Sequence, residues 1–143
     1  MSDEAPELAV CAFRVGRAVY GIDVARVEQV LPRVVPLPLA GAAPPVEGVV
    51  HLHGVRVPLV DLRKLLPRGQ PPHGARPQVI VARLGRRRIA LRVDGLEAVR
   101  SHALQTVRPT EAGAPRGVIA EVGPPEAPCL LLDLKLLLQM GRH

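Results

Sequence analysis

An internal repeat limits the possible folds of this 143-residue chain more than any other feature of its sequence. A shift of 69 residues places the segment that begins at Phe13, FRVGRAVYGIDVARVEQV, over the segment that begins at Ala82, ARLGRRRIALRVDGLEAV, without a gap. Identical residues are Arg14, Gly16, Arg17, Val24, Glu28 and Val30, which fall on Arg83, Gly85, Arg86, Val93, Glu97 and Val99. The chain therefore contains two copies of one structural unit.

The repeat continues to the end of each copy. The same shift carries Gly48 onto Gly117, and three extra residues at 124–126 then change the shift to 72. With the longer shift, Asp61 falls on Asp133, and each aspartate precedes a short leucine-rich segment. Aspartate before an apolar segment is typical of a helix N-cap, so each unit is expected to end in a short helix.

Short apolar segments between regularly spaced glycines and prolines predict strands in the rest of each unit. Segments 10–15 and 19–24 flank one expected turn, and segments 78–84 and 88–93 flank another. A sheet of about five short strands can hide its edges by curling into a small barrel. The fold class is therefore all-β, with two SH3-like five-stranded barrels related by the internal repeat and accompanied by short helices.

The expected domain organisation follows the repeat. Residues 1–8 are expected to be a flexible N-terminus, and 9–143 one domain. Within it, subdomain 1 covers about 9–66, a linker rich in proline and glycine covers 67–77, and subdomain 2 covers about 78–138. A unit of about 65 residues is marginally stable alone, so the two units are expected to share an interior with a groove between the barrels.

Charge and cysteine content narrow the class of protein. The net charge is +6, which suggests nucleic acid as a partner, but the arginines are scattered and the cluster 86–88 falls in an expected hairpin turn. Phe13 and Tyr20 are the only aromatic residues, in core-type strand positions, so nucleic acid is the less favoured partner. Cys11 and Cys129 lie in apolar segments and are expected to be reduced thiols.

Other features place the chain outside the membrane. No apolar segment approaches the ~20 residues of a membrane span, and the polar, acidic residues 1–7 do not resemble a secretory signal. A cytoplasmic location without direct membrane insertion is the expectation.

Neither a metal site nor an enzyme is indicated by a motif of this sequence. His51 and His53 would share one face if their segment were a strand, but further ligands are lacking nearby in the sequence. No nucleophile elbow, phosphate loop or dinucleotide fingerprint occurs. We therefore expect no catalytic residues, no metal, no cofactor and no small-molecule substrate.

The segment 46–66, VEGVVHLHGVRVPLVDLRKLL, resembles the signature of CheW proteins and of the regulatory domain of CheA kinases. The matched residues are Gly48, Val49, Leu52, Gly54, Val57, Pro58, Asp61, Leu62 and Arg63. Further blocks agree in order, with Phe13, Gly16, Tyr20, Gly21, Ile22 and Asp23 upstream and Gly85, Val93, Asp94, Gly95 and Val99 downstream. The resemblance covers residues 8–138 and implies the same two-barrel fold.

Most of the matched residues also have a structural explanation. Gly16, Gly54 and Gly85 are expected in turns that need a positive φ. Pro58 is expected on an edge strand or at a bulge, where its missing N–H does no harm. Gly48, Asp61, Asp94 and Gly95 complete the set of fold-determining positions.

The resemblance implies an adaptor function without catalysis, at cytoplasmic receptor arrays. The implied partners are the signalling tip of a chemoreceptor (a methyl-accepting protein) and either a CheA-type kinase regulatory domain or another CheW-like adaptor. The implied receptor-binding groove contains Gln29, Val30, Leu31, His53 and Val55. The implied kinase-facing surface contains Val34, Val35, Leu37 and Leu39. The alternative from another class is a basic SH3-like protein that binds nucleic acid.

Two positions depart from the family pattern. His53 stands where the family has an arginine, and Gln29 stands where it has a glutamate. An arginine–carboxylate pair is bidentate and permanently charged, whereas a histidine–glutamine pair is neither near neutral pH. The departures predict weakened kinase coupling, and they resemble the divergence of accessory adaptors such as FrzB of gliding-motility pathways.

Overall fold

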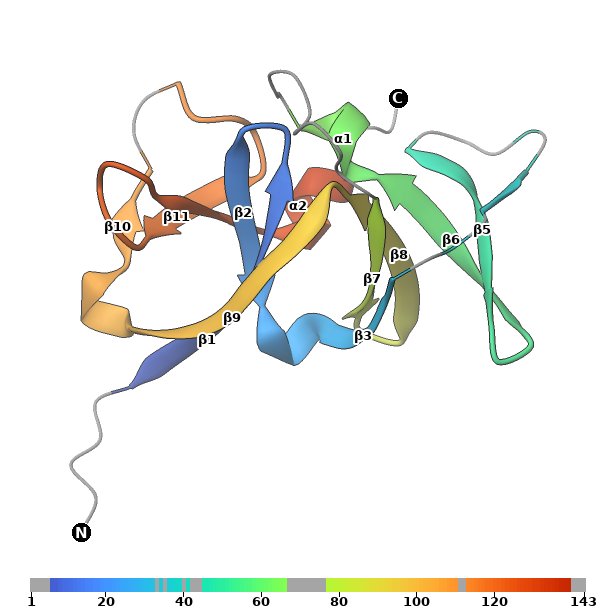
Figure 1. The fold of residues 1–143 in the computed structure, drawn as a ribbon, viewed down its shortest axis with the longest axis horizontal. Helices are drawn as coiled ribbons and strands as arrows, with labels where there is room; N and C mark the ends of the chain where they lie inside the picture. The colour runs from blue at the N-terminus through green and yellow to red at the C-terminus, as the bar shows by residue number, and fades with distance from the viewer. Residues whose placement is uncertain are drawn as a thin grey trace, which may run out of the picture.

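The two halves of the chain form the same succession of elements (Figure 1). The computed structural model describes residues 6–32, 34, 36–39, 41, 45–66, 77–110 and 113–139. The first half contains β1 (Glu7–Val15), β2 (Ala18–Asp23), the 3-10 helix η1 (Val24–Arg26), β3 (Val27–Leu31), β4 (Leu37–Pro38), β5 (Val46–Leu52), β6 (Val55–Asp61) and α1 (Leu62–Leu65). The second half contains β7 (Gln78–Leu84), β8 (Arg87–Val93), β9 (Gly95–Ala103), the 3-10 helix η2 (Leu104–Thr106), β10 (Arg108–Pro109), β11 (Val118–Val122), β12 (Cys129–Leu132) and α2 (Leu134–Gln139). The repeat is confirmed, and each unit has one two-residue strand beyond the five expected.

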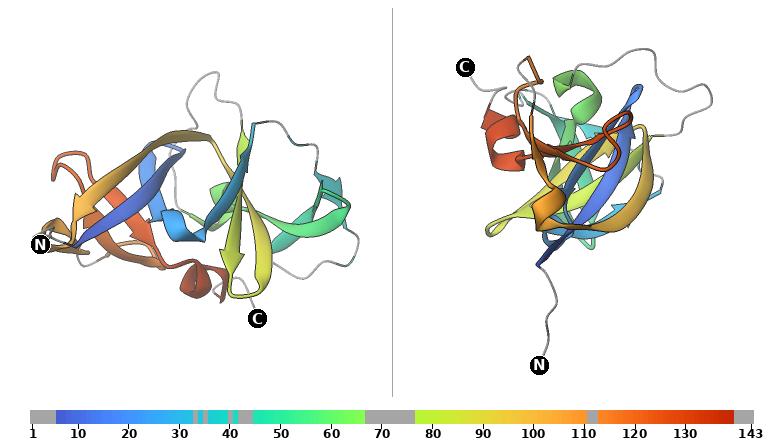
Figure 2. Two further views of the ribbon diagram at one scale, coloured as in Figure 1. Left: turned by 90° about the horizontal axis from the view of Figure 1, so that it is seen from below. Right: turned by 90° about the vertical axis from the view of Figure 1, so that its left-hand side faces the viewer.

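The strands form two six-stranded sheets (Figures 1 and 2). Each sheet contains four strands from one half of the chain and the first hairpin of the other half. Sheet A has the order β10-β11-β12-β2-β1-β9, and sheet B has the order β3-β7-β8-β6-β5-β4. The β1–β2 hairpin thus pairs with strands of the second unit, and the β7–β8 hairpin pairs with strands of the first. The expected subdomains 9–66 and 78–138 therefore do not coincide with the two sheets. The sequence suggested that each barrel is built from the strands of one unit. Instead, β2 pairs with β12 and β8 pairs with β6, both in parallel.

Two ion pairs at equivalent positions of the repeat join the exchanged hairpins to their new sheets. Arg14 of the first unit pairs with Glu97 of the second. Their repeat equivalents, Arg83 and Glu28, pair in the opposite sense, with 3.6 Å between Arg83 Nε and Glu28 Oε1. Both pairs join a hairpin of one unit to an edge strand of the other, so the identical residues of the repeat serve the exchange.

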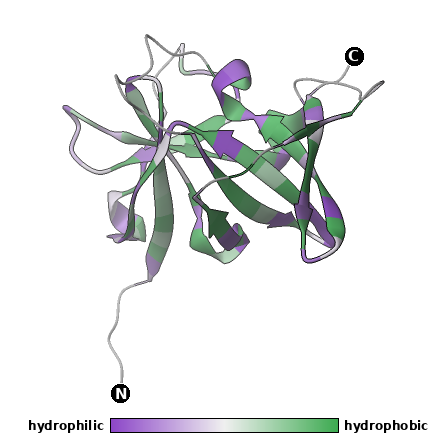
Figure 3. Cartoon of the chain, turned by 45° about the vertical axis from the view of Figure 1, so that its right-hand side comes forward, coloured by the Kyte–Doolittle hydropathy of each residue, from purple (hydrophilic) through white to green (hydrophobic). Residues whose placement is uncertain are grey.

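The two units share one interior, as expected. The largest buried cluster draws on both halves and both sheets, including Phe13, Tyr20, Val60, Leu91 and Leu137. Smaller clusters fill sheet B around Val50 and Val81 and sheet A around Val10 and Val122. Apolar residues run along the strands that enclose these clusters (Figure 3). Apolar burial is therefore shared between the two units and contributes to the stability of both sheets.

Two expectations from the sequence need correction, and a third concerns residues outside the described ranges. β1 begins at Glu7, so residues 7 and 8 belong to a strand and not to a flexible N-terminus, because they pair with β9. The expected linker 67–77 lies outside the described residues except for Pro77. Pro58 is not on an edge strand, since β6 lies between β5 and β8. Its missing N–H is tolerated because the ladder between β6 and β8 begins only at Leu59.

The β5–β6 turn corrects the expectation for His53. β5 ends at Leu52, and the two residues of the turn, His53 and Gly54, have φ values of 50° and 77°. Two successive positive φ values are typical of a type I′ hairpin turn. His53 therefore does not share a strand face with His51. Gly16 and Gly85 occupy equivalent turns, with φ of 62° and 63°, as their place in the repeat predicts.

Candidate functional site

An apolar hollow lies between the two sheets, where edge strand β3 of sheet B approaches β9 of sheet A. Its volume is about 250 Å³. It is lined by Cys11, Val24, Val27, Val30, Leu96, Glu97, Ala98 and Val99. The repeat carries Val27 onto Leu96 and Val30 onto Val99, so the two walls of this inter-barrel groove are equivalent parts of the two units.

Side chains at the groove are accessible to a partner. Val99 is 63% exposed and Leu96 is 37% exposed, which is unusual for branched aliphatic residues next to a core. Val24, Val27 and Val30 are half-buried and pack against the shared core. These three valines are therefore held in place by packing, while Leu96 and Val99 remain accessible to solvent. Such a surface can bind the apolar face of a helix.

Ion pairs bound the groove on both sides. Glu97 pairs with Arg14 on one wall. Glu28 pairs with Arg88 at 2.9 Å and with Arg83 at 3.6 Å on the other. Because these charges are mutually neutralised, the groove offers a partner mainly apolar area.

The residues expected in the receptor-binding groove are divided between two places. Val30 lines the groove, and Gln29 is its half-buried neighbour in β3. Leu31 packs against the interior of sheet B. His53 lies at the β5–β6 turn and Val55 begins β6, which is separated from β3 by β7 and β8 in the order of sheet B. The wall opposite Val30 belongs to β9.

The expected kinase-facing residues are also divided. Val34 packs against the interior of sheet B, and Val35 lies outside the described residues. Leu37 and Leu39 are 47% and 44% exposed, on and beside the edge strand β4. Val55 is 48% exposed in β6, two strands away. These exposed leucines form a second apolar surface on sheet B.

Four of the matched fold positions meet in one polar cluster at the sheet junction. Asp94 is 4% exposed, and its Oδ2 accepts a 2.6 Å hydrogen bond from the N–H of Gly16. Its Oδ1 lies 3.7 Å from Nη1 of Arg63. Arg63 also donates to both carboxylate oxygens of Asp61, at 2.9 and 2.8 Å. The cluster ties α1 and the β8–β9 junction to the β1–β2 turn, so it orients one sheet relative to the other.

The charge state of this cluster follows from its contacts. Burial alone would raise the pKa of Asp61, but the hydrogen bonds and the positive charge of Arg63 outweigh it and hold that pKa below its usual value. Asp61 Oδ1 also accepts from the N–H of Arg63, which confirms Asp61 as the N-cap of α1. Asp133 Oδ1 caps α2 in the same way, by accepting from the N–H of Leu136.

One glycine of the family pattern has a local reason. A Cβ on Gly48 would lie 2.5 Å from the carbonyl oxygen of Leu37, so only glycine allows β4 to approach β5. Gly95 begins β9, and a Cβ there would meet only the side-chain oxygen of Gln78, at 3.8 Å, so nothing in the structure requires glycine at this position. The next residue, Leu96, donates its N–H to the same side chain at 2.7 Å, which holds the start of edge strand β9.

Neither cysteine forms a disulfide, as expected. Burial raises the pKa of Cys11, and burial together with the neighbouring Cys11 raises the pKa of Cys129 to about 11. Both are therefore protonated near neutral pH and poor nucleophiles. Among the described residues, no group of three or more His, Cys, Asp or Glu side chains could hold a metal ion. No helix in the described ranges is long and apolar enough to cross a membrane.

Sequence reasoning named only Val30 among the residues that line the groove, and it missed the others: Cys11, Val24, Val27, Leu96, Glu97, Ala98 and Val99. The signal was present in the repeat, since the shift of 69 carries the β3 residues onto those of β9. The sequence did not reveal the exchange of hairpins between the units, which brings the equivalent edge strands β3 and β9 together.

Two comparisons with known protein sequences identify the family of the chain, and a comparison with solved structures supports the fold. The family model of the CheW-like domain matches residues 9–142. The chemotaxis protein CheW of Klebsiella aerogenes is 31% identical over 97 residues, which cover 68% of this chain. That match spans 58% of the length of the relative. The crystal structure of the scaffolding protein TtCheW from Thermoanaerobacter tengcongensis superposes with a TM-score of 0.79 at 19% identity, over 92% of each chain, and supports the two-barrel fold. With nearly its whole length matched, the chain belongs to the CheW-like domain family.

Proposed function

We propose that the protein is a non-catalytic chemosensory adaptor that acts at cytoplasmic receptor arrays. It binds the helical signalling tip of a chemoreceptor in the inter-barrel groove. It carries a CheA-type kinase regulatory domain, or another CheW-like adaptor, on the exposed Leu37 and Leu39 at the edge strand β4. The single observation that supports this most is the open apolar groove between the equivalent strands β3 and β9.

The chemistry of the groove fits a helix better than nucleic acid. Its lining is mainly aliphatic, and its charged lining residue Glu97 and the flanking Glu28 are each paired with arginine. Single-stranded nucleic acid needs exposed aromatic rings on which bases stack. Phe13 and Tyr20, the chain's only two aromatic residues, are 0% and 1% exposed. The positive net charge alone therefore does not support the alternative function.

A charge placed in the groove tests receptor binding. Changing Val99→Asp is expected to weaken binding of a receptor signalling-tip fragment at least tenfold, because a carboxylate would replace aliphatic area worth about 1.5–3 kcal/mol. Titration calorimetry with the helical-hairpin fragment measures the change. The matched control is Ile119→Asp, since Ile119 is 53% exposed on β11 and does not line the groove. Equal loss in both variants, or none in Val99→Asp, would place the receptor elsewhere.

Restoring the two charged residues of the family pattern tests kinase coupling. Gln29 in β3 and His53 at the β5–β6 turn lie on opposite sides of β7 and β8 in sheet B, so each restored charge would meet a partner and not the other residue. Gln29→Glu and His53→Arg are each expected to strengthen assembly with receptor and kinase, and the double change more than either single change, because a hydrogen bond to a charged group is worth about 1–3 kcal/mol. Titration of the four variants against both partners measures it. No gain in any variant would mean that coupling depends on other residues.

A further inference from the structure

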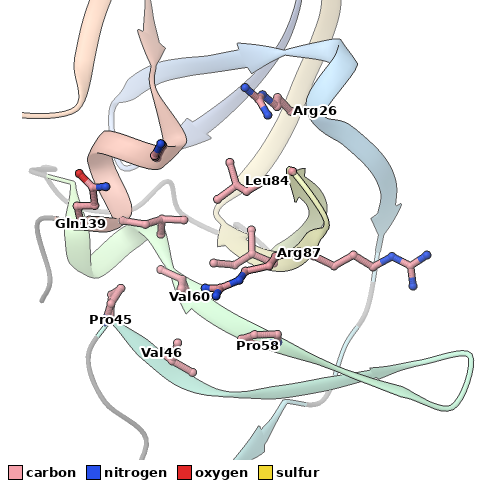
Figure 4. A pocket seen from close by; sticks show the side chains of 13 residues that line it. Arg26, Pro45, Val46, Pro58, Val60, Leu84, Arg87 and Gln139 are labelled. Carbon is pink, nitrogen blue, oxygen red and sulfur yellow. The ribbon is translucent and has the colours of Figure 1, made fainter.

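The largest of the described hollows shares no lining residue with the groove and combines an aliphatic wall with several cations (Figure 4). Its volume is about 570 Å³. The apolar lining is Val46, Pro58, Val60, Leu84, Ile89 and Leu138. The cations are Arg26 of η1, Arg87 and Arg88 of β8 and Lys135 of α2. Figure 4 shows Arg26 on one side and Val46 with Pro58 on the other, so a ligand would touch both kinds of wall.

This hollow occupies the repeat-equivalent position of the polar cluster. Gly85 corresponds to Gly16 under the shift of 69, and Lys135 corresponds to Arg63 under the shift of 72. The two glycines have nearly the same φ, 63° and 62°. At the first junction, the carboxylate of Asp94 fills the space and is held by Gly16 and Arg63. The residue equivalent to Asp94 is Ala25, which has no carboxylate.

Three of the four cations of the second junction form no ion pair with a described residue. Arg88 pairs with Glu28, but Arg26, Arg87 and Lys135 form no ion pair within the described part of the chain. Two carboxylates lie nearby, on an adjoining hollow, and each is a cap: Asp23 accepts from the N–H of Ala25, and Asp133 accepts from that of Leu136. The site therefore carries net positive charge beside unfilled apolar area.

We propose that this hollow is a second docking site, which binds an acidic peptide segment of a partner protein. One carboxylate of the peptide takes the position that Asp94 occupies at the first junction, and an adjacent aliphatic side chain enters the hollow. The cations come from three separate elements, which suits several spaced carboxylates better than one anionic group. An aliphatic lining without aromatic rings favours a peptide over nucleic acid. The site is independent of the groove and of the receptor proposed to bind there.

The test uses fluorescently labelled peptides of about ten residues in which glutamates alternate with leucines, titrated with the full-length protein. A matched peptide carries glutamine in place of every glutamate, and another carries serine in place of every leucine. The acidic leucine peptide is expected to bind at least tenfold more tightly than either, and more weakly as salt is raised. Methyl NMR is expected to show shifts at Leu84, Ile89 and Leu138 and none at Val99.

Variants locate the site. Lys135→Glu and Arg87→Glu are each expected to weaken the acidic peptide at least tenfold, whereas Lys135→Arg retains binding. Arg17→Glu is the control, with the same charge change at the exposed β1–β2 turn; all four must keep the wild-type thermal transition. Val99→Asp is expected to leave peptide binding unchanged, which separates this proposal from the receptor groove. The proposal is wrong if the glutamine peptide binds as tightly, if Arg17→Glu matches Lys135→Glu, or if a single-stranded DNA oligonucleotide binds more tightly than the peptide.

Discussion

Neither half of the chain, 1–70 or 71–143, is expected to give a cooperative thermal transition alone. Each half lacks the hairpin that its other strands need: strands β3–β6 require β7 and β8, and strands β9–β12 require β1 and β2. Separation would also open the shared core and expose residues such as Phe13 and Leu91. A fragment of about 70 residues that loses its central strands cannot bury enough apolar area to offset its conformational entropy.

Mixing the two halves in equal amounts is expected to restore the transition, because every missing pairing partner is then present. Circular dichroism and differential scanning calorimetry of each half and of the mixture measure this. The control is the intact protein with a protease site inserted between residues 66 and 77 and cut after folding, which is expected to retain its transition. A sharp transition near that of the whole protein in either isolated half would contradict the dependence of each sheet on both halves.

Much of this fold could be predicted because its information is local or repeated. Gly16 and Gly85 mark equivalent turns, and Asp61 and Asp133 mark equivalent helix starts, so element order follows from short-range chemistry. The apolar pattern places the aliphatic residues inside correctly. Whether a hairpin pairs with its own unit or with the other one is a different question. The same strand faces are buried in both cases, so hydrophobic pattern cannot distinguish them.

The candidate groove shows the consequence of that ambiguity. Val30, which was expected in the groove, lines this hollow from edge strand β3, but the opposite wall, Leu96 and Val99, depends on the exchange. A shared strand face for His51 and His53 required a strand through both residues, and the structure gives His53 a positive φ at a turn. Residues other than glycine rarely adopt a positive φ, so the turn was indicated mainly by Gly54. Of the residues that the resemblance implies for the groove, Val30 lines the hollow between β3 and β9, whereas His53 and Val55 lie elsewhere on sheet B.

Removing the carboxylate of Asp94 is expected to cost about 3 kcal/mol of unfolding free energy, the usual scale for breaking a buried ion pair. Asp94→Ala leaves the N–H of Gly16 without its 2.6 Å acceptor, and Arg63, whose side chain is 23% exposed, keeps only Asp61 as a partner. Asp94→Asn retains an acceptor for Gly16 and is expected to cost less. Urea denaturation at pH 7 measures both.

The matched control for Asp94→Ala is Glu47→Ala, which removes the partner of Lys64 at 2.6 Å in a pair whose lysine is 66% exposed. Exposed pairs of this kind are worth about 0–1 kcal/mol. If Asp94→Ala destabilised the protein no more than Glu47→Ala, the polar cluster would not be what joins the sheets. If it does destabilise as expected, α1, the β8–β9 junction and the β1–β2 turn are held by one carboxylate. At the equivalent junction Ala25 supplies no such carboxylate, so Arg26, Arg87 and Lys135 form no ion pair within the described part of the chain and stay available for a partner.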